Sequence, residues 1–199
     1  MNLVKKGLNF IVWSFLLTFA AIVIAFVPAI MAATIEGDPS EAMTNTMSVL
    51  ILVTQIVTLL AGVFMFVGYT FGKLGGNKRF SIAFWCQIAV LTIQVIDIIL
   101  TVAGVYKTQG GTGVAIALTF IVAIAQVATT LFACTACGEA VPEMKTLSIV
   151  TLIFMAASYI LTACGTVTNA LTFVAGVCNI VGVILYIILV VKTRNRIKA

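Results

Sequence analysis

The chain has 199 residues, of which 62% are hydrophobic and only 9% are charged. Soluble domains carry about 25% charged residues, so this composition excludes a soluble globular protein and indicates an integral membrane protein. The net charge is +5 and there is no histidine, which removes the usual general base and the usual zinc or haem ligand.

Six apolar segments are each long enough to cross a bilayer as a helix. In chain order they are residues 8–33, 46–71, 80–106, 114–137, 147–164 and 170–191. No connection between them is large enough to be a domain. The sequence therefore predicts that residues 1–199 form one all-α transmembrane domain, a six-helix bundle.

The basic residues lie at the ends of these segments and predict their orientation. If both termini share one side, only Lys107 among the lysines and arginines falls on the other side. The residues on the shared side are Lys5, Lys6, Lys73, Lys78, Arg79, Lys145, Lys192, Arg194, Arg196 and Lys198. The positive-inside rule makes that side cytoplasmic, and we expect the protein in a cell membrane, plasma or inner, with both termini cytoplasmic.

Short similarities suggest that the bundle consists of three similar helical hairpins. The second and fourth segments contain Gln55-Ile56-Val57-Thr58 and Gln126-Val127-Ala128-Thr129, and the sixth contains Asn179-Ile180-Val181-Gly182. Apolar sequences align with one another cheaply, so the pattern leaves both an internal triplication and coincidence open.

The third segment holds Asp97, the only charged side chain deep inside an apolar segment. Such a charge costs about 2.5–3.5 kcal/mol on insertion scales, so it should not face lipid. At about 100° per residue, Gln87, Gln94, Asp97 and Thr101 fall on one helix face. That face should point into protein or water, and Asp97 should be protonated, hydrated or matched by a bound cation.

Long polar side chains of four other segments fall near the depth of this face, when depth is counted at about 1.5 Å per residue. They are Gln55, Gln126, Tyr159 and Asn179. One interpretation is a binding site at the bilayer midplane for a substrate or a coupling ion. The other is hydrogen bonding that holds the helices together, which we favour for the amides, whereas we favour function for Asp97.

Cys134 and Cys137 form a C-x-x-C pair in the fourth segment, and Cys86 lies at similar depth in the third. A thiolate metal site or a redox pair is one interpretation, but structural zinc needs four ligands. Small-residue packing between helices explains the same pattern, and we favour it. We therefore expect no metal and no cofactor.

Two functions from different classes remain. The first is a small transporter or channel-like protein with a polar site around Asp97 for a cation, a proton-coupled solute or another small solute. The second is a non-catalytic subunit or sensor that packs against other membrane proteins. An enzyme is not expected, since one intramembrane acid supplies no catalytic constellation. The expected partners are the lipid bilayer, a small solute or cation, and other membrane subunits, with no nucleic acid.

Overall fold

The computed structural model describes residues 2–34, 41–107, 111–165 and 170–197. Within these ranges the chain forms six long α-helices and no strand, as the sequence predicts. The helices are α1 (Leu3–Thr34), α2 (Glu41–Leu74), α3 (Lys78–Val102), α4 (Gly111–Ala140), α5 (Lys145–Gly165) and α6 (Ala170–Arg196). All six contain a stretch long and apolar enough to cross a membrane, and large apolar side chains such as Ile124 and Phe173 cover the outer surface.

The predicted end of the third span is wrong. The sequence predicts a helix to Tyr106, but α3 ends at Val102. Gly104 adopts a φ of +70°, a left-handed conformation that glycine adopts at little cost. A short 3₁₀ helix, Val105–Lys107, then follows. The break turns the chain back, so that Tyr106 reaches the side chain of Asp97. In a continuous helix Tyr106 would lie about one turn beyond Val102.

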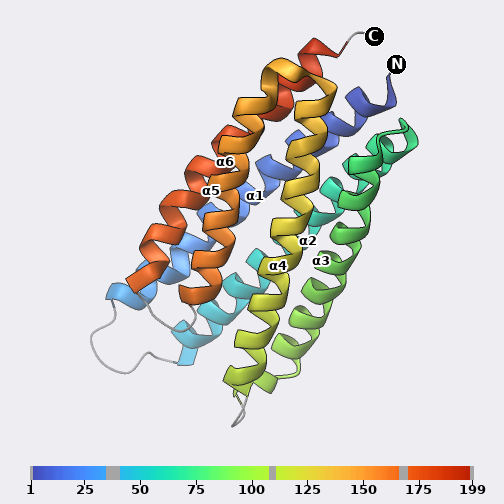
Figure 1. The fold of residues 1–199 in the computed structure, drawn as a ribbon. Coiled ribbons are helices and arrows are strands. Elements are labelled where there is room, and N and C mark those ends of the chain that lie inside the picture. Colours follow the sequence, from blue (N-terminus) through green and yellow to red (C-terminus); the bar gives the residue numbers. More distant parts are fainter. Residues whose placement is uncertain (1, 35–40, 108–110, 166–169, 198–199) are drawn as a thin grey trace.

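The helices form a ring in the order of the sequence. Each helix packs against the next one along the chain, α6 closes the ring against α1, and α4 also touches α6. Both termini lie at the same end of the bundle (Figure 1). We call this end the terminal end, and the other end the far end. An even number of spans places the termini together in this way.

Two glycines allow α1 and α2 to pack closely. A Cβ atom on Gly7 would lie 2.4 Å from the backbone oxygen of Gly68, and one on Gly68 would lie 2.8 Å from that of Gly7. Both distances are well below van der Waals contact, so only glycine fits at this crossing. Small residues give membrane helices this kind of close backbone approach.

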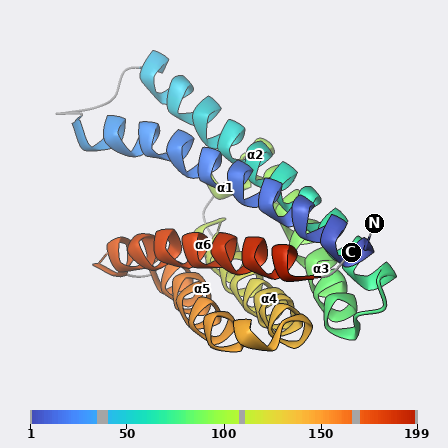
Figure 2. The same ribbon diagram turned by 90° about the horizontal axis from the view of Figure 1, so that it is seen from above.

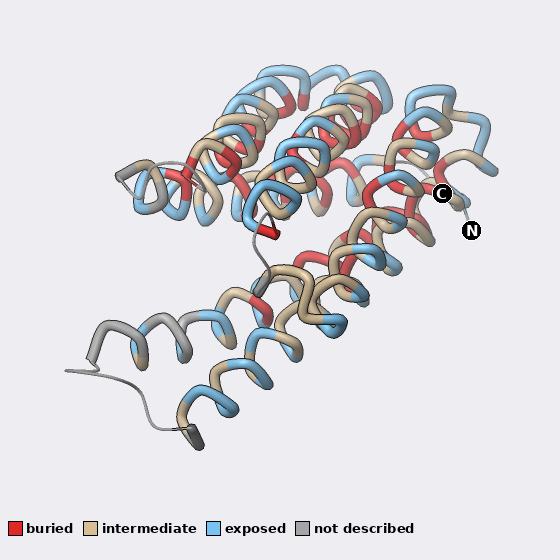
Figure 3. Tube along the Cα trace, turned by 90° about the horizontal axis from the view of Figure 1, so that it is seen from below, coloured by how far each residue is buried: buried red, intermediate tan, exposed pale blue. Residues whose placement is uncertain are grey.

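The ring is closed at the terminal end and spread at the far end. The Tyr186 ring packs edge-on against Phe15 at 4.6 Å, its hydroxyl lies 3.4 Å from that of Tyr69, and Arg194 donates to Asn9 Oδ1 over 3.0 Å. Seen from above, α1 and α2 diverge from α5 and α6 toward the far end (Figure 2). Where their burial is described, the diverging segments of α1 and α2 are mostly intermediate or exposed (Figure 3).

Candidate functional site

A cavity of about 410 Å³ lies inside the ring, and all six helices contribute to its wall. We call it the central cavity. Phe15 lines it on the side of the terminal end, where the contacts with Tyr186 form a floor. Binding pockets for small molecules commonly have volumes of about 300–1,000 Å³, so this space is of the size that holds a small ligand.

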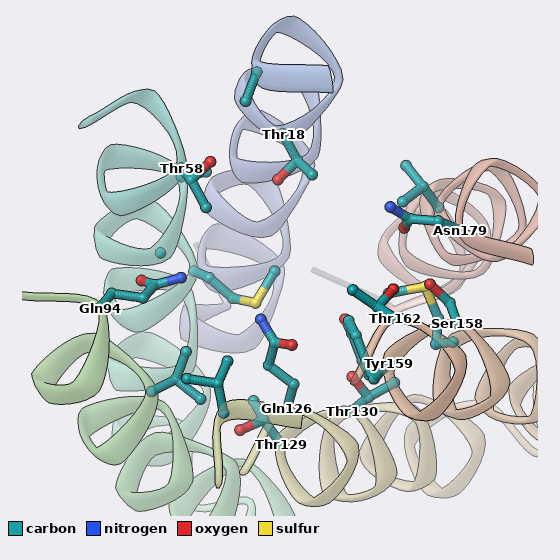
Figure 4. Close-up of a pocket in the computed structure, with 18 of the residues that line it drawn as sticks. Thr18, Thr58, Gln94, Gln126, Thr129, Thr130, Ser158, Tyr159, Thr162 and Asn179 are labelled. Atoms are coloured by element: carbon teal, nitrogen blue, oxygen red, sulfur yellow. The ribbon is translucent and has the colours of Figure 1, made fainter. Parts of the chain in front are cut away.

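Five of the residues predicted from sequence to form a site line the central cavity. They are Gln87, Gln94, Gln126, Tyr159 and Asn179, from α3, α4, α5 and α6, and Figure 4 shows the last four on different sides of one space. Counting depth along each helix therefore brought together side chains that lie far apart in the sequence.

Several polar atoms of this wall have no partner. The side-chain oxygens Gln94 Oε1 and Ser14 Oγ are both buried without a hydrogen bond. In the described part of the chain the amides of Gln126 and Asn179 also form no side-chain hydrogen bond. A buried polar group that lacks a partner costs about 1–3 kcal/mol. Interhelical hydrogen bonding was the interpretation that the sequence favoured for the amides. In the described structure the side chains of Gln94, Gln126 and Asn179 do not form such bonds.

Gln87 differs from the other amides of the site. It is buried, and its Nε2 donates to the backbone oxygen of Gly62 on α2 over 3.2 Å. Gln87 therefore ties α3 to α2, which is the interhelical role that the sequence analysis favoured for the amides.

Short hydroxyl side chains, which were not predicted from the sequence, complete the wall. Ser14 and Thr18 of α1 and Ser158 and Thr162 of α5 line the central cavity, and Figure 4 labels three of them around it. The first segment had been expected to contribute no long polar side chain. The i, i+4 spacing in each pair, which places both residues on one helix face, was the signal available.

Asp97 lies beside the central cavity, in a second space of about 230 Å³ that we call the side pocket. Gln55 and Asp97 line this pocket, and Gln94 lines both spaces. Gln55 Nε2 donates to Asp97 Oδ2 over 3.2 Å and to the Thr101 hydroxyl over 3.1 Å. The carboxyl group is thus surrounded by polar neighbours and does not face lipid alone, as expected.

The second neighbour of Asp97 is Tyr106, the last residue of the third predicted segment. Its hydroxyl donates to Asp97 Oδ1 over 2.5 Å. Burial, this hydrogen bond and the negative charge of Asp97 raise the pKa of Tyr106 to about 12, so the phenol keeps its proton at neutral pH and remains a donor. Gly104 two residues earlier was the signal for the turn that brings it there.

The alternative thiolate site is not formed. Cys86, Cys134 and Cys137 are free thiols, and the last two are buried in the packed terminal end. Among the described residues no group of three or more cysteine, aspartate or glutamate side chains could hold a metal ion. Cys134 and Cys137 instead belong to the hydrophobic core.

The two spaces differ in charge. None of the described residues that line the central cavity is charged, and its polar atoms belong to amides and hydroxyls. The side pocket contains one carboxyl group. The central cavity can therefore form many hydrogen bonds but offers no ion pair to a ligand.

Comparisons of the chain with models of protein families, with curated proteins and with solved structures find no match.

Proposed function

We propose that the protein is a small membrane transporter that binds an uncharged polar solute in its central cavity. The observation that carries the proposal is a set of polar side chains with no hydrogen-bond partner in the described structure, Ser14, Gln126 and Asn179, in a cavity that all six helices line. A solute with several hydroxyl or amide groups would satisfy them, and would also accept from the Gln94 amide nitrogen, which is directed into the cavity (Figure 4).

Charge supports an uncharged solute over an ion as the ligand of this cavity. An ion taken out of water needs an opposite charge or several dedicated ligands, and the described wall of the central cavity has no charged side chain. Amides and hydroxyls can both donate and accept hydrogen bonds, which suits sugars, polyols, amides and nucleobases.

The shape of the ring supports access from the far end. The helices separate toward that end, whereas Phe15, Tyr69 and Tyr186 pack together on the side of the terminal end. If the termini are cytoplasmic, the far end lies outside and the solute would enter the cavity from there, and transport would require these aromatic side chains to separate. Transporters alternate between two such states around a site at the midplane.

The test is uptake of a panel of uncharged polar solutes into proteoliposomes. At least one solute should enter faster than in protein-free vesicles, and Gln126→Met and Asn179→Leu should each slow its uptake about tenfold or more. Thr92→Val is the matched control, because Thr92 is exposed on the outer surface and its hydroxyl bonds only to Ile88 O.

Uptake that none of the cavity variants changes would refute the proposed site. If no solute of the panel enters or binds, the alternative of a non-catalytic membrane subunit or sensor takes its place.

A further inference from the structure

The side pocket adjoins the central cavity and shares part of its wall. Thr54, Thr58, Gln94 and Thr119 line both spaces. Asp97 and Gln55 line only the side pocket. Whatever binds in the side pocket therefore lies next to a solute in the central cavity, with Gln94 between them.

The unpartnered polar atoms of this pocket are acceptors. Gln55 Oε1 and Gln94 Oε1 are buried with no hydrogen bond. The Gln55 donor is already used, since Gln55 Nε2 bonds to both Asp97 and Thr101, and the Gln94 amide nitrogen is directed into the central cavity (Figure 4).

The threonine hydroxyls of the pocket add to this excess of acceptors. Each one donates its proton to a backbone oxygen of its own helix: Thr54 to Leu50 O at 2.9 Å, Thr58 to Thr54 O at 2.8 Å, and Thr119 to Ala115 O at 2.8 Å. Their remaining lone pairs can only accept.

We propose that the side pocket binds a monovalent cation of the size of Na⁺. The ligands would be the carboxylate of Asp97 and the side-chain oxygens of Gln55 and Gln94, with threonine hydroxyls or water completing the shell. Hard cations take oxygen ligands of this kind. One carboxylate balances one positive charge, and the pocket of about 230 Å³ has room for the ion together with water.

Gln94 would connect this ion to the solute, and this part of the inference rests on the proposed function. Figure 4 shows the Gln94 amide nitrogen directed into the central cavity and its oxygen directed away from it. A cation on the oxygen would fix the amide in this orientation and present its N–H groups to an acceptor of the solute. Binding of the ion would then strengthen binding of the solute, and the reverse must hold by linkage.

The first experiment needs no solute. The thermal unfolding midpoint of purified protein is measured in NaCl and in choline chloride at constant ionic strength, with titration of Na⁺. A ligand that binds only the folded state raises the midpoint, so we expect Na⁺ to raise it in a saturable manner. Asp97→Asn should abolish the rise, and Gln94→Met should increase the half-saturating Na⁺ concentration about tenfold or more.

Glu139→Gln is the matched control, because it also removes one carboxylate, from an exposed ion pair with Arg79 at the terminal end. It should leave the Na⁺ dependence unchanged. If Asp97→Asn does not fold, Gln94→Met and Thr58→Val carry the test. Equal midpoints in NaCl and choline chloride would overturn the proposal, as expected for a pocket that holds only water or a proton. So would a Na⁺ effect that Asp97→Asn preserves.

The two proposals fail separately. A Na⁺ effect that depends on Asp97, without binding of any solute, would leave the cation site standing and refute the central cavity as a solute site. Solute binding that depends on Gln126 and is equal in NaCl and choline chloride would leave the central cavity standing as a solute site and refute the coupled cation site.

Discussion

Replacing Gln94 by Met tests whether the amide is kept for binding at the expense of stability. Gln94 Oε1 is buried without a partner, a state that costs about 1–3 kcal/mol. Methionine has a similar length and no oxygen to satisfy. In Na⁺-free buffer without solute, Gln94→Met should therefore increase the free energy of unfolding by about 1–3 kcal/mol, measured by reversible unfolding in mixed micelles.

Gln87→Met is the matched control on the same helix. Gln87 has a partner, since its Nε2 donates to Gly62 O. Hydrogen bonds between membrane helices contribute about 0.6 kcal/mol on average and at most about 1.7 kcal/mol. Gln87→Met should therefore destabilise the protein by about that amount. If Gln94→Met destabilises it as much, Gln94 holds the helices together and the argument for a binding site fails.

Three further predictions concern the framework. Gly68→Val should destabilise the protein by about 1–3 kcal/mol, because its Cβ would lie 2.6 Å from Ile11 Cγ1, whereas Gly176→Ala, whose Cβ meets nothing within 4 Å, should be neutral or stabilising in the same unfolding assay. Because the pKa of Tyr106 is raised to about 12 from the usual 10.0, its contribution to stability should be complete below pH 10 and be lost as the pH rises through 12; Tyr106→Phe should remove this alkaline dependence, and an unchanged profile would contradict the contact with Asp97. Tyr186→Ala should open the floor of the cavity and make vesicles leak the transported solute; tight vesicles would place the barrier elsewhere.

Much of the fold follows from the sequence, because bilayer thickness sets the length of a spanning segment and lipid enforces helical hydrogen bonding. Six spans could be counted for that reason. The end of α3 could not be placed from hydropathy, since Ala103 and Val105 continue the apolar run and Tyr106 is of a type common at the end of a membrane span. A single backbone conformation, the positive φ of Gly104, decides it, and with it the partner of Asp97.

The candidate site was predicted in part. Residue counting gives depth, so it brought Gln94, Gln126, Tyr159 and Asn179 to one layer, and the structure places them around one cavity. Depth alone does not give rotation about each helix axis, which tertiary packing sets. For this reason the sequence could not separate Gln87, which bonds to Gly62, from Gln94, which has no partner. It also could not place Asp97 in a pocket of its own.

Equilibrium binding of a solute from the uptake panel decides whether the central cavity is a solute site. We expect the wild-type protein to bind one solute per chain, and Gln126→Met combined with Asn179→Leu to weaken this binding by about a hundredfold, about tenfold for each amide. The combined variant should remain folded, since neither amide has a hydrogen-bond partner in the described structure. Equal affinity in the wild-type protein and the combined variant would show that the solute binds elsewhere and would refute the central cavity as its site.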